Sequence, residues 1–188
     1  MLELPVTGGV HLAARGKITM LAGGDVNLFR QNYPLLQAVG DDIFHIGPIG
    51  SAAVIKVITN MLAFIHLVAD GEALMLAKKG GLNLDIAWQA IAASSGNSFV
   101  HETEGQLILN GSYDIGFTME LALKDLGFVS QFSKEFGVPL ELADKVKQIF
   151  EEGKKTYGGE AQSTQVVKLL EDALNTNLRA DGYPPTLT

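Results

Sequence analysis

The sequence contains no cysteine among its 188 residues. A disulfide framework, a thiolate metal site and a cysteine nucleophile are therefore excluded. Basic residues are also scarce, because 14 Lys and Arg stand against 21 Asp and Glu, a formal net charge of −7. Nucleic acids and anionic membranes bind clustered cations, so this balance argues against both as partners. The lack of cysteine fits a reducing, cytoplasmic location.

Motifs for several other chemistries are missing as well. The sequence has neither the G-x-S-x-G elbow of a serine hydrolase nor a Walker loop for a nucleoside triphosphate. Its first residues, MLELP, lack the basic start and apolar run of a signal peptide, so we expect none. The four histidines show no spacing of four residues that would place two ligands on one helix face. We therefore expect structural roles for His11, His45, His66 and His101, and no metal site.

The first 47 residues have the pattern of an α/β layer. Runs rich in β-forming residues predict strands at residues 2–6, 17–21 and 43–46. Asp25 can cap a short helix, and Pro34 suits the first turn of a second helix at residues 35–39.

From Gly47 onward the pattern is almost purely helical. Residues 47–50, GPIG, form a hinge by composition, and a long helix is expected from Ser51 to about Lys79. Its first part, residues 51–68, is apolar on nearly every side, which predicts a helix buried all around rather than a membrane span. Further helices are expected at residues 84–93, 98–109, 117–136, 139–152 and 161–175, and a loose tail at residues 181–188.

Lys56, Asn60 and His66 interrupt the apolar part of the long helix. Lys56 and Asn60 are four residues apart, so they lie one turn apart on nearly the same face. Burying an ammonium group costs several kcal/mol unless it is paired or its pKa falls from about 10.4. Lys56 is therefore either a functional group or a lysine that extends its charge to solvent, and periodicity alone leaves both readings open.

The helix expected at residues 117–136 carries an apolar stripe at helical spacing. The stripe consists of Phe117, Leu121, Phe128, Phe132 and Phe136. Asp125 falls on this stripe, with Lys124 beside it, where another apolar residue is expected. A carboxylate on a core face needs a partner or a function, and a buried structural ion pair is the simpler of the two.

Three segments carry motifs in a fixed order. Residues 5–24, PVTGGVHLAARGKITMLAGG, contain P-V-T-G-G, A-x-x-G and a terminal Gly-Gly. Residues 47–60, GPIGSAAVIKVITN, follow G-x-G-x-x-x-K-x-x-x-N with Ala52 in place of the second glycine. Residues 117–126, FTMELALKDL, match F-x-x-x-L-x-x-K-D-L. Together the segments resemble the β-hydroxyacid dehydrogenase family, which includes 3-hydroxyisobutyrate dehydrogenase and tartronate semialdehyde reductase, where Ser is usual at the position of Thr7.

The resemblance implies an enzyme that interconverts a short β-hydroxy acid and its semialdehyde or keto form with NAD or NADP. It implies that Lys56 is the general acid/base at the hydroxyl oxygen and that Asn60 orients the substrate. Thr7, Gly8 and Gly9 would bind the substrate carboxylate.

The same resemblance implies roles for three residues of the third segment. Lys124 and Phe117 would contact the cofactor, and Asp125 would help to form the substrate site.

The resemblance also implies the fold class and the domains. The chain would be mainly α: the helical C-terminal domain of a two-domain enzyme like 6-phosphogluconate dehydrogenase, at residues 48–188, forming at least a homodimer. A short α/β remnant of the Rossmann domain, residues 1–47, would precede it. The family's G-x-G-x-x-G loop for the pyrophosphate is not in the sequence, so the NAD(P) site is expected to be incomplete and the choice between NAD and NADP stays open.

Two alternatives remain beside this reading. One is a truncated, inactive helical dimerisation or binding module derived from the family. The other is a related group that reduces imines, in which resemblance implies another residue in place of the catalytic lysine, so Lys56 argues against it.

Overall fold

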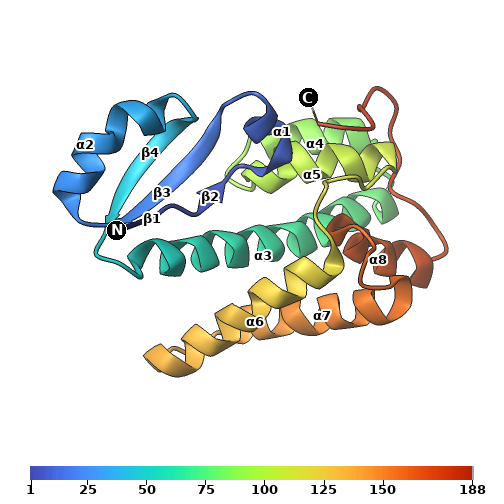
Figure 1. Cartoon of the computed structure of the whole chain (residues 1–188). Helices are drawn as coiled ribbons and strands as arrows, with labels where there is room; N and C mark the ends of the chain where they lie inside the picture. Colours follow the sequence, from blue (N-terminus) through green and yellow to red (C-terminus); the bar gives the residue numbers. More distant parts are fainter. Residues whose placement is uncertain (188) are drawn as a thin grey trace. The chain divides into compact units, whose positions relative to one another are not determined.

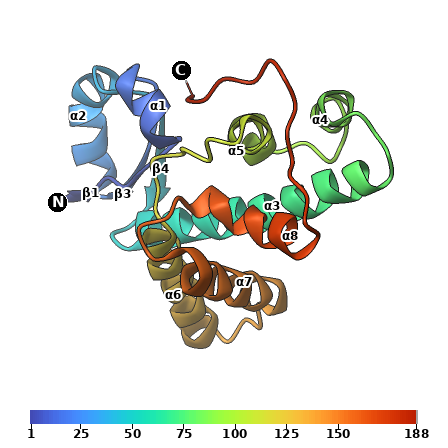
Figure 2. The same ribbon diagram turned by 90° about the vertical axis from the view of Figure 1, so that its right-hand side faces the viewer.

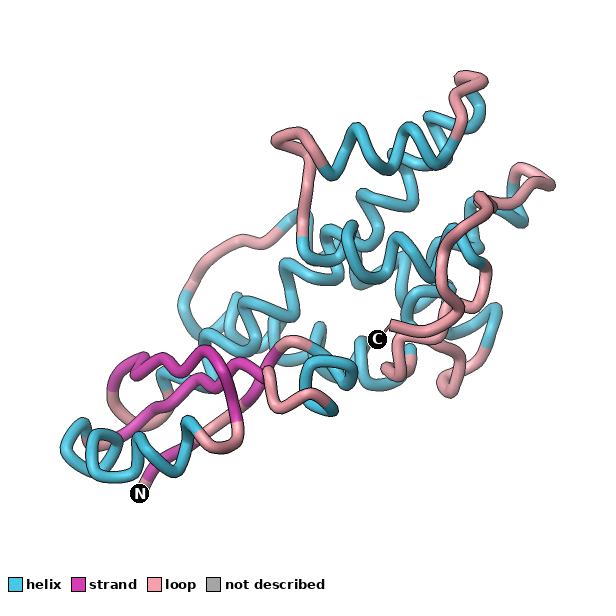
Figure 3. The backbone as a smooth tube through the Cα atoms, turned by 90° about the horizontal axis from the view of Figure 1, so that it is seen from above, coloured by secondary structure: helices cyan, strands magenta, loops and turns pink. Residues whose placement is uncertain are grey.

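The computed structural model describes residues 1–187, which form two compact units. The first unit is Met1–Asn60, and the second begins at Met61. Helices predominate, and every described strand belongs to the first unit (Figures 1 and 3). The division between the units falls inside one continuous helix, so the domain boundary expected at residue 47 stays a prediction.

The first unit contains a small mixed sheet. Its strands are β1 (Leu2–Glu3), β2 (Val6–Thr7), β3 (Ile18–Gly24) and β4 (Gly40–Gly47). β3 is central: β4 pairs with it in parallel, and β1 and β2 pair antiparallel with its other edge. The pairs Glu3–Gly23 and Val6–Met20 keep the same register, so β1 and β2 are one edge strand interrupted at residues 4–5. The single strand predicted at residues 2–6 is therefore wrong in this detail, because Pro5 has no N–H to donate to the ladder.

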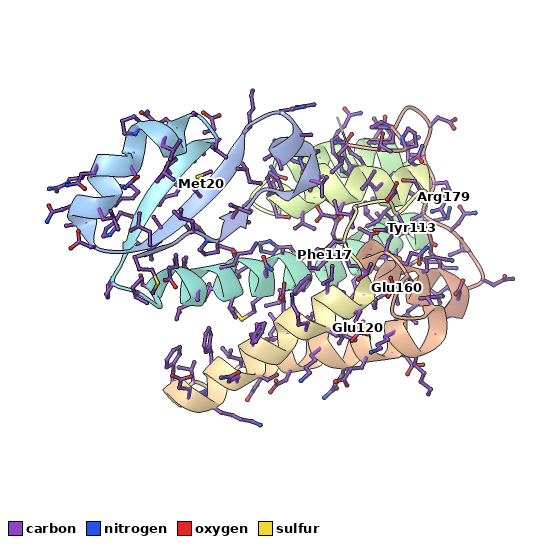
Figure 4. The ribbon with its side chains drawn as sticks, in the orientation of Figure 1. Met20, Tyr113, Phe117, Glu120, Glu160 and Arg179 are labelled. Carbon is purple, nitrogen blue, oxygen red and sulfur yellow. The ribbon has the colours of Figure 1, made fainter. Side chains whose placement is uncertain are left out.

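Helix α2 (Val26–Gln37) packs on the sheet. Asp25 caps it as predicted, because one carboxylate oxygen accepts from the backbone N–H groups of Asn27 and Leu28, both at 2.8 Å. The two short helices expected here are one helix, with Pro34 inside it. Pro34 lies near the C-terminal end of α2, and the carbonyl that loses its partner belongs to the exposed Arg30, so water can satisfy it. Met20 of β3 belongs to the small core formed with α2 (Figure 4).

Helix α3 (Ser51–Lys79) confirms the predicted start and end of the long helix. Among the described residues it is the one helix long and apolar enough to cross a membrane, a property that core helices of soluble proteins share. The expectation of burial on every side is wrong, because only 17% of its most apolar 18-residue window is buried. Ile58 and Leu62, for example, are 39% and 43% exposed. A helix that is apolar on every side can be buried on any face, but the pattern does not indicate which faces the rest of the chain covers.

The second unit is a cluster of helices. They are the rest of α3 with α4 (Leu84–Ala92), α5 (Phe99–Asn110), α6 (Met119–Phe136), α7 (Glu141–Tyr157), the 3-10 helix η1 (Ser163–Val167) and α8 (Lys168–Ala173). Helices α6 and α7 lie side by side as a hairpin (Figures 1 and 2). Phe150 and Met119 are fully buried in the core of this unit. The helix predicted at residues 161–175 is instead a 3-10 helix followed by a short α-helix.

The buried face of α6 differs from the predicted one. Met119, Ala122, Leu126 and Val129 face the core. The aromatic stripe is largely outside, since Phe128 is 44% and Phe136 is 53% exposed. Two apolar faces lie side by side on this helix, and the sequence pattern does not tell which of them the rest of the chain covers.

A buried carboxylate anchors the C-terminal segment. Glu171, 3% exposed, accepts from the Tyr113 hydroxyl at 2.5 Å, the Leu178 N–H at 2.6 Å and the Arg179 guanidinium at 3.0 Å. Arg179 also lies over the ring of Tyr113, and Figure 4 labels both residues.

The tail expected at residues 181–188 is not loose where it is described. Tyr183 donates its hydroxyl to Asp85, and its carbonyl accepts from Asn110. Thr188, the last residue of that prediction, lies outside the described residues.

Candidate active site

The Lys56–Asn60 pair lies in the second and third turns of α3. Lys56 Nζ donates to Asn60 Oδ1 at 2.8 Å, and both side chains are partly buried. The predicted spacing on one helix face thus brings an amine and an amide into direct contact. The amide oxygen of Asn60 thereby orients the lysine amine.

The start of α3 is capped by a residue from another element. Glu3 Oε1 accepts from Gly50 N at 2.8 Å and from Ala52 N at 2.9 Å. The first N–H groups of a helix have no partner within the helix, and a carboxylate there is also favoured by the helix dipole. The Ala52 side chain, in the place of the family's second glycine, is fully buried and leaves this contact intact.

The Thr7–Gly9 segment joins the edge strand to a short helix. Thr7 ends β2, opposite Thr19, and α1 (Gly9–Ala14) begins two residues later. Gly8 and Gly9 have φ of +118° and +83°, where any side chain is strained, and a Cβ on Gly8 would lie 3.0 Å from Leu12 Cδ1. The two glycines therefore allow a tight turn between the strand and the helix.

The other three predicted site residues belong to the second unit. Lys124 and Asp125, on α6, form an ion pair at 3.7 Å, with side chains 56% and 16% exposed. The acid is thus mostly covered and the ammonium is largely in solvent. Phe117, just before α6, is half-buried and stacks near Phe64, with ring centroids 6.2 Å apart.

Among the described residues no group of three or more acidic or histidine side chains is arranged to hold a metal ion. His101 is a buried structural residue: its Nδ1 lies 2.5 Å from Asp70 Oδ1, and its Nε2 lies 2.9 Å from the Trp88 carbonyl. Burial disfavours the imidazolium and lowers the pKa of His101. The hydrogen bonds to the Asp70 carboxylate and the Trp88 carbonyl favour the imidazolium more strongly, so the pKa of His101 is raised. Trp88 stacks on the His101 ring, with 5.4 Å between the ring centroids.

Sequence reasoning missed Glu3 and the buried acids Asp70 and Glu171. The only signal for Glu3 was a charged residue inside an apolar strand pattern, next to the P-V-T-G-G motif. Its partners, Gly50 and Ala52, are 47 and 49 residues away, so no local pattern could have identified them.

Comparison with known proteins places these residues in a family. Residues 50–170 match the model of the NAD-binding region of NADP-dependent 3-hydroxyisobutyrate dehydrogenase. Residues 1–47 match the NAD-binding domain of 6-phosphogluconate dehydrogenase.

Individual relatives agree with the family models. The chain is 32% identical to an L-threonate dehydrogenase of Haemophilus influenzae, over 90% of this chain and 56% of that protein. It is 33% identical to a 2-(hydroxymethyl)glutarate dehydrogenase of Eubacterium barkeri, over 90% of this chain and 57% of the relative. The crystal structure of a 3-hydroxyisobutyrate dehydrogenase from Salmonella typhimurium superposes with a TM-score of 0.81 and 31% identity, covering 90% of this chain and 60% of that one.

The chain spans little more than half the length of the curated relatives it matches. Within that span the family models and the fold agree, and the cofactor of the matched families is NAD or NADP. The chain belongs to the β-hydroxyacid dehydrogenase family of NAD(P)-dependent oxidoreductases, together with 3-hydroxyisobutyrate dehydrogenase.

Proposed function

We propose that this chain carries the substrate-binding and proton-transfer half of a dehydrogenase that interconverts a short β-hydroxy acid and its semialdehyde or keto form. The observation that supports it most is the 2.8 Å contact between Lys56 Nζ and Asn60 Oδ1, which fixes an amine on a rigid helix. A proton-transfer group must be held within hydrogen-bond reach of the atom it serves, and a side chain locked by a neighbour on a helix meets that need.

In this proposal Lys56 acts at the substrate oxygen. In the oxidative direction the neutral amine accepts the hydroxyl proton while the carbinol carbon loses a hydride, so a C=O bond forms and the amine becomes an ammonium. In the reverse direction the ammonium returns the proton to the carbonyl oxygen. Asn60 holds the amine and hydrogen-bonds the substrate.

Thr7, Gly8 and Gly9 would bind the substrate carboxylate. The Thr7 hydroxyl and the N–H groups at the start of α1 can donate to an anion without an arginine. The enclosing turn depends on the positive φ of both glycines, so this binding mode should not survive a side chain at either position.

The described residues fit a dinucleotide in part. The exposed Lys124 ammonium and the partly buried Phe117 ring offer a cation and an apolar face, while Asp125 supports Lys124 from the covered side. No glycine-rich loop for the pyrophosphate occurs in the sequence. When bound, the nicotinamide supplies the hydride acceptor. The chain alone should therefore bind NAD(H) or NADP(H) weakly, and micromolar affinity by calorimetry would contradict this.

The decisive experiment uses a fusion of the chain to the part of the Haemophilus L-threonate dehydrogenase that the chain does not span. L-threonate, 2-(hydroxymethyl)glutarate and 3-hydroxyisobutyrate are tested as substrates with both cofactors. Lys56→Met removes the amine at similar volume and should lower kcat about 10²–10⁴-fold, whereas Asn60→Ala should chiefly raise KM. Thermal unfolding and cofactor binding of the Lys56→Met fusion serve as the control.

A Lys56→Met fusion that kept more than about a tenth of the kcat would refute the proton-transfer role. A folded fusion that bound cofactor but oxidised none of the acids would favour the alternative of an inactive helical dimerisation module. A homo-oligomer and a cytoplasmic location belong to the same proposal.

A further inference from the structure

Glu3 connects two elements that each carry part of the proposed site. It lies four residues before Thr7 on the edge strand, and its carboxylate holds the first turn of α3, one turn before Lys56. A single oxygen, Oε1, accepts from both Gly50 N and Ala52 N. Hydrogen bonds that involve an ionised group are about twice as strong as neutral ones, so this contact is a firm one.

The sheet leaves space for this contact at one glycine. Gly23 of β3 is the register partner of Glu3, and a Cβ on Gly23 would lie 2.3 Å from Glu3 Oε1. A side chain at residue 23 would therefore displace the Glu3 carboxylate from the position that it occupies. Gly23, the first glycine of the Gly23–Gly24 pair, therefore leaves space for the Glu3 carboxylate and does not serve to form a turn.

We propose that Glu3 is a positioning residue, which locks the helix turn before Lys56 to the strand that leads into Thr7–Gly9. The inference rests on the proposed roles of these residues. A strand and a helix are both stiff, so a tie at their near ends fixes the separation between the proton-transfer amine and the carboxylate-binding turn. Rate depends steeply on such separations, because a displacement of about 1 Å can cost about 10²-fold.

The contact between Glu3 and the start of α3 can be tested on the chain itself, with no measurement of catalytic activity. Glu3→Ala removes the acceptor, and Gly23→Ala keeps Glu3 but fills the space its carboxylate occupies. Both variants should speed amide hydrogen exchange at Gly50 and Ala52 by about tenfold or more, while Glu3→Gln, which keeps one acceptor oxygen, should lie between them and the wild type. Asp41→Asn, at an exposed acid of the same unit, should leave exchange unchanged.

Residual dipolar couplings then report the positioning. In the wild type the couplings of residues 6–9 and 51–60 should fit one rigid frame, and in Glu3→Ala they should need two. A Glu3→Ala chain whose couplings still fit one frame, or whose Gly50 and Ala52 amides stay protected, would overturn the proposal.

In the fusion described above, Glu3→Ala should lower kcat/KM about 10- to 100-fold at a temperature well below unfolding. Glu3→Gln should recover most of this loss. A residue that only stabilises the fold would lower the unfolding temperature and leave kcat/KM within about twofold, and that result would also overturn the proposal. Failure of this proposal can be told apart from failure of the proposed function. An active Lys56→Met fusion would refute the role of the lysine, whereas hydrogen exchange and residual dipolar couplings test the contact between Glu3 and α3 without any turnover.

Discussion

Glu104 of α5 should make the second unit less stable as pH rises, and Glu104→Gln should remove this effect. Burial raises the pKa of Glu104 because it disfavours the charged carboxylate, and the negative charge of Asp70 raises it further. Hydrogen bonds from Thr103 and the backbone lower the pKa, but the net result is a pKa of about 7. Its ordinary value is 4.5. The acid therefore holds its proton in the folded chain at a pH where the unfolded chain has lost it.

The hydrogen bonds around Glu104 are consistent with a neutral acid. The Thr103 hydroxyl lies within hydrogen-bond distance of both the Phe99 carbonyl and Glu104 Oε2, but it has only one proton. If Glu104 is protonated, it can donate to Thr103 Oγ1 while Thr103 donates to Phe99 O. A glutamine N–H can make the same donation, so Glu104→Gln preserves the arrangement.

The sign and size follow from linkage. The folded pKa is raised, so the folded state binds more protons between pH 4.5 and about 7, and stability falls across this window. Each pKa unit corresponds to about 1.4 kcal/mol, which gives a loss of about 3 kcal/mol by pH 8. Glu104→Gln should match the wild type near pH 4.5 and exceed its unfolding free energy by about 3 kcal/mol at pH 8.

Urea unfolding followed by circular dichroism at pH 4.5, 6 and 8 measures this difference. The Asp70–His101 pair is present in both proteins, so its own titration largely cancels. Glu135→Gln, at an exposed position on α6, is the matched control and should show a difference that does not change with pH. If the Glu104→Gln difference were also constant with pH, or if the variant were the less stable protein at pH 8, the reasoning would be refuted.

Three further predictions concern the packing and the self-association of the second unit. Phe150→Ala, at a fully buried position, should cost about 3–5 kcal/mol in denaturant unfolding, whereas Leu142→Ala, at a position 60% exposed, should change stability by less than about 1 kcal/mol; equal effects would contradict the assigned core. Glu171→Ala leaves the buried Tyr113 hydroxyl and the Leu178 amide without their acceptor, so a loss of about 1–3 kcal/mol for each of them and rapid hydrogen exchange at Leu178 are expected; retained protection at Leu178 would count against the anchor. A second copy of the chain should cover the exposed aromatic stripe of α6. The wild type should therefore sediment as at least a dimer at micromolar concentration, and Phe128→Asp should shift it toward the monomer. A monomeric wild type would contradict this proposal.

The sequence was sufficient where the signal was local. Helix α3 begins and ends as predicted, because the segment Gly47–Gly50 precedes Ser51 and Gly80-Gly81 follows Lys79. The Lys56–Asn60 contact was likewise expected, since residues four apart on a helix are neighbours.

Where tertiary context decides, the sequence was not sufficient. The break of the edge strand at Pro5 follows from its missing N–H, yet the unchanged register across the break appears only in the pairing with β3. The stripe through Phe128 has the same period as the buried stripe through Leu126, so periodicity could not choose between them. Glu3 was missed because its role depends on a helix turn almost fifty residues away and on a glycine in the neighbouring strand.

The anchor at Glu171 constrains the order in which a newly made chain can complete its fold. Its carboxylate takes one partner from Tyr113, made 58 residues earlier, and two from Leu178 and Arg179, made seven and eight residues later. Until Leu178 and Arg179 have left the ribosome, burying the Glu171 carboxylate beside Tyr113 would leave its charge without the cation and the amide donor that it binds in the folded chain. The second unit is therefore expected to reach its final packing only after Leu178 and Arg179 have left the ribosome, while the sheet of the first unit, whose partners all lie within residues 2–47, can form as soon as that segment emerges.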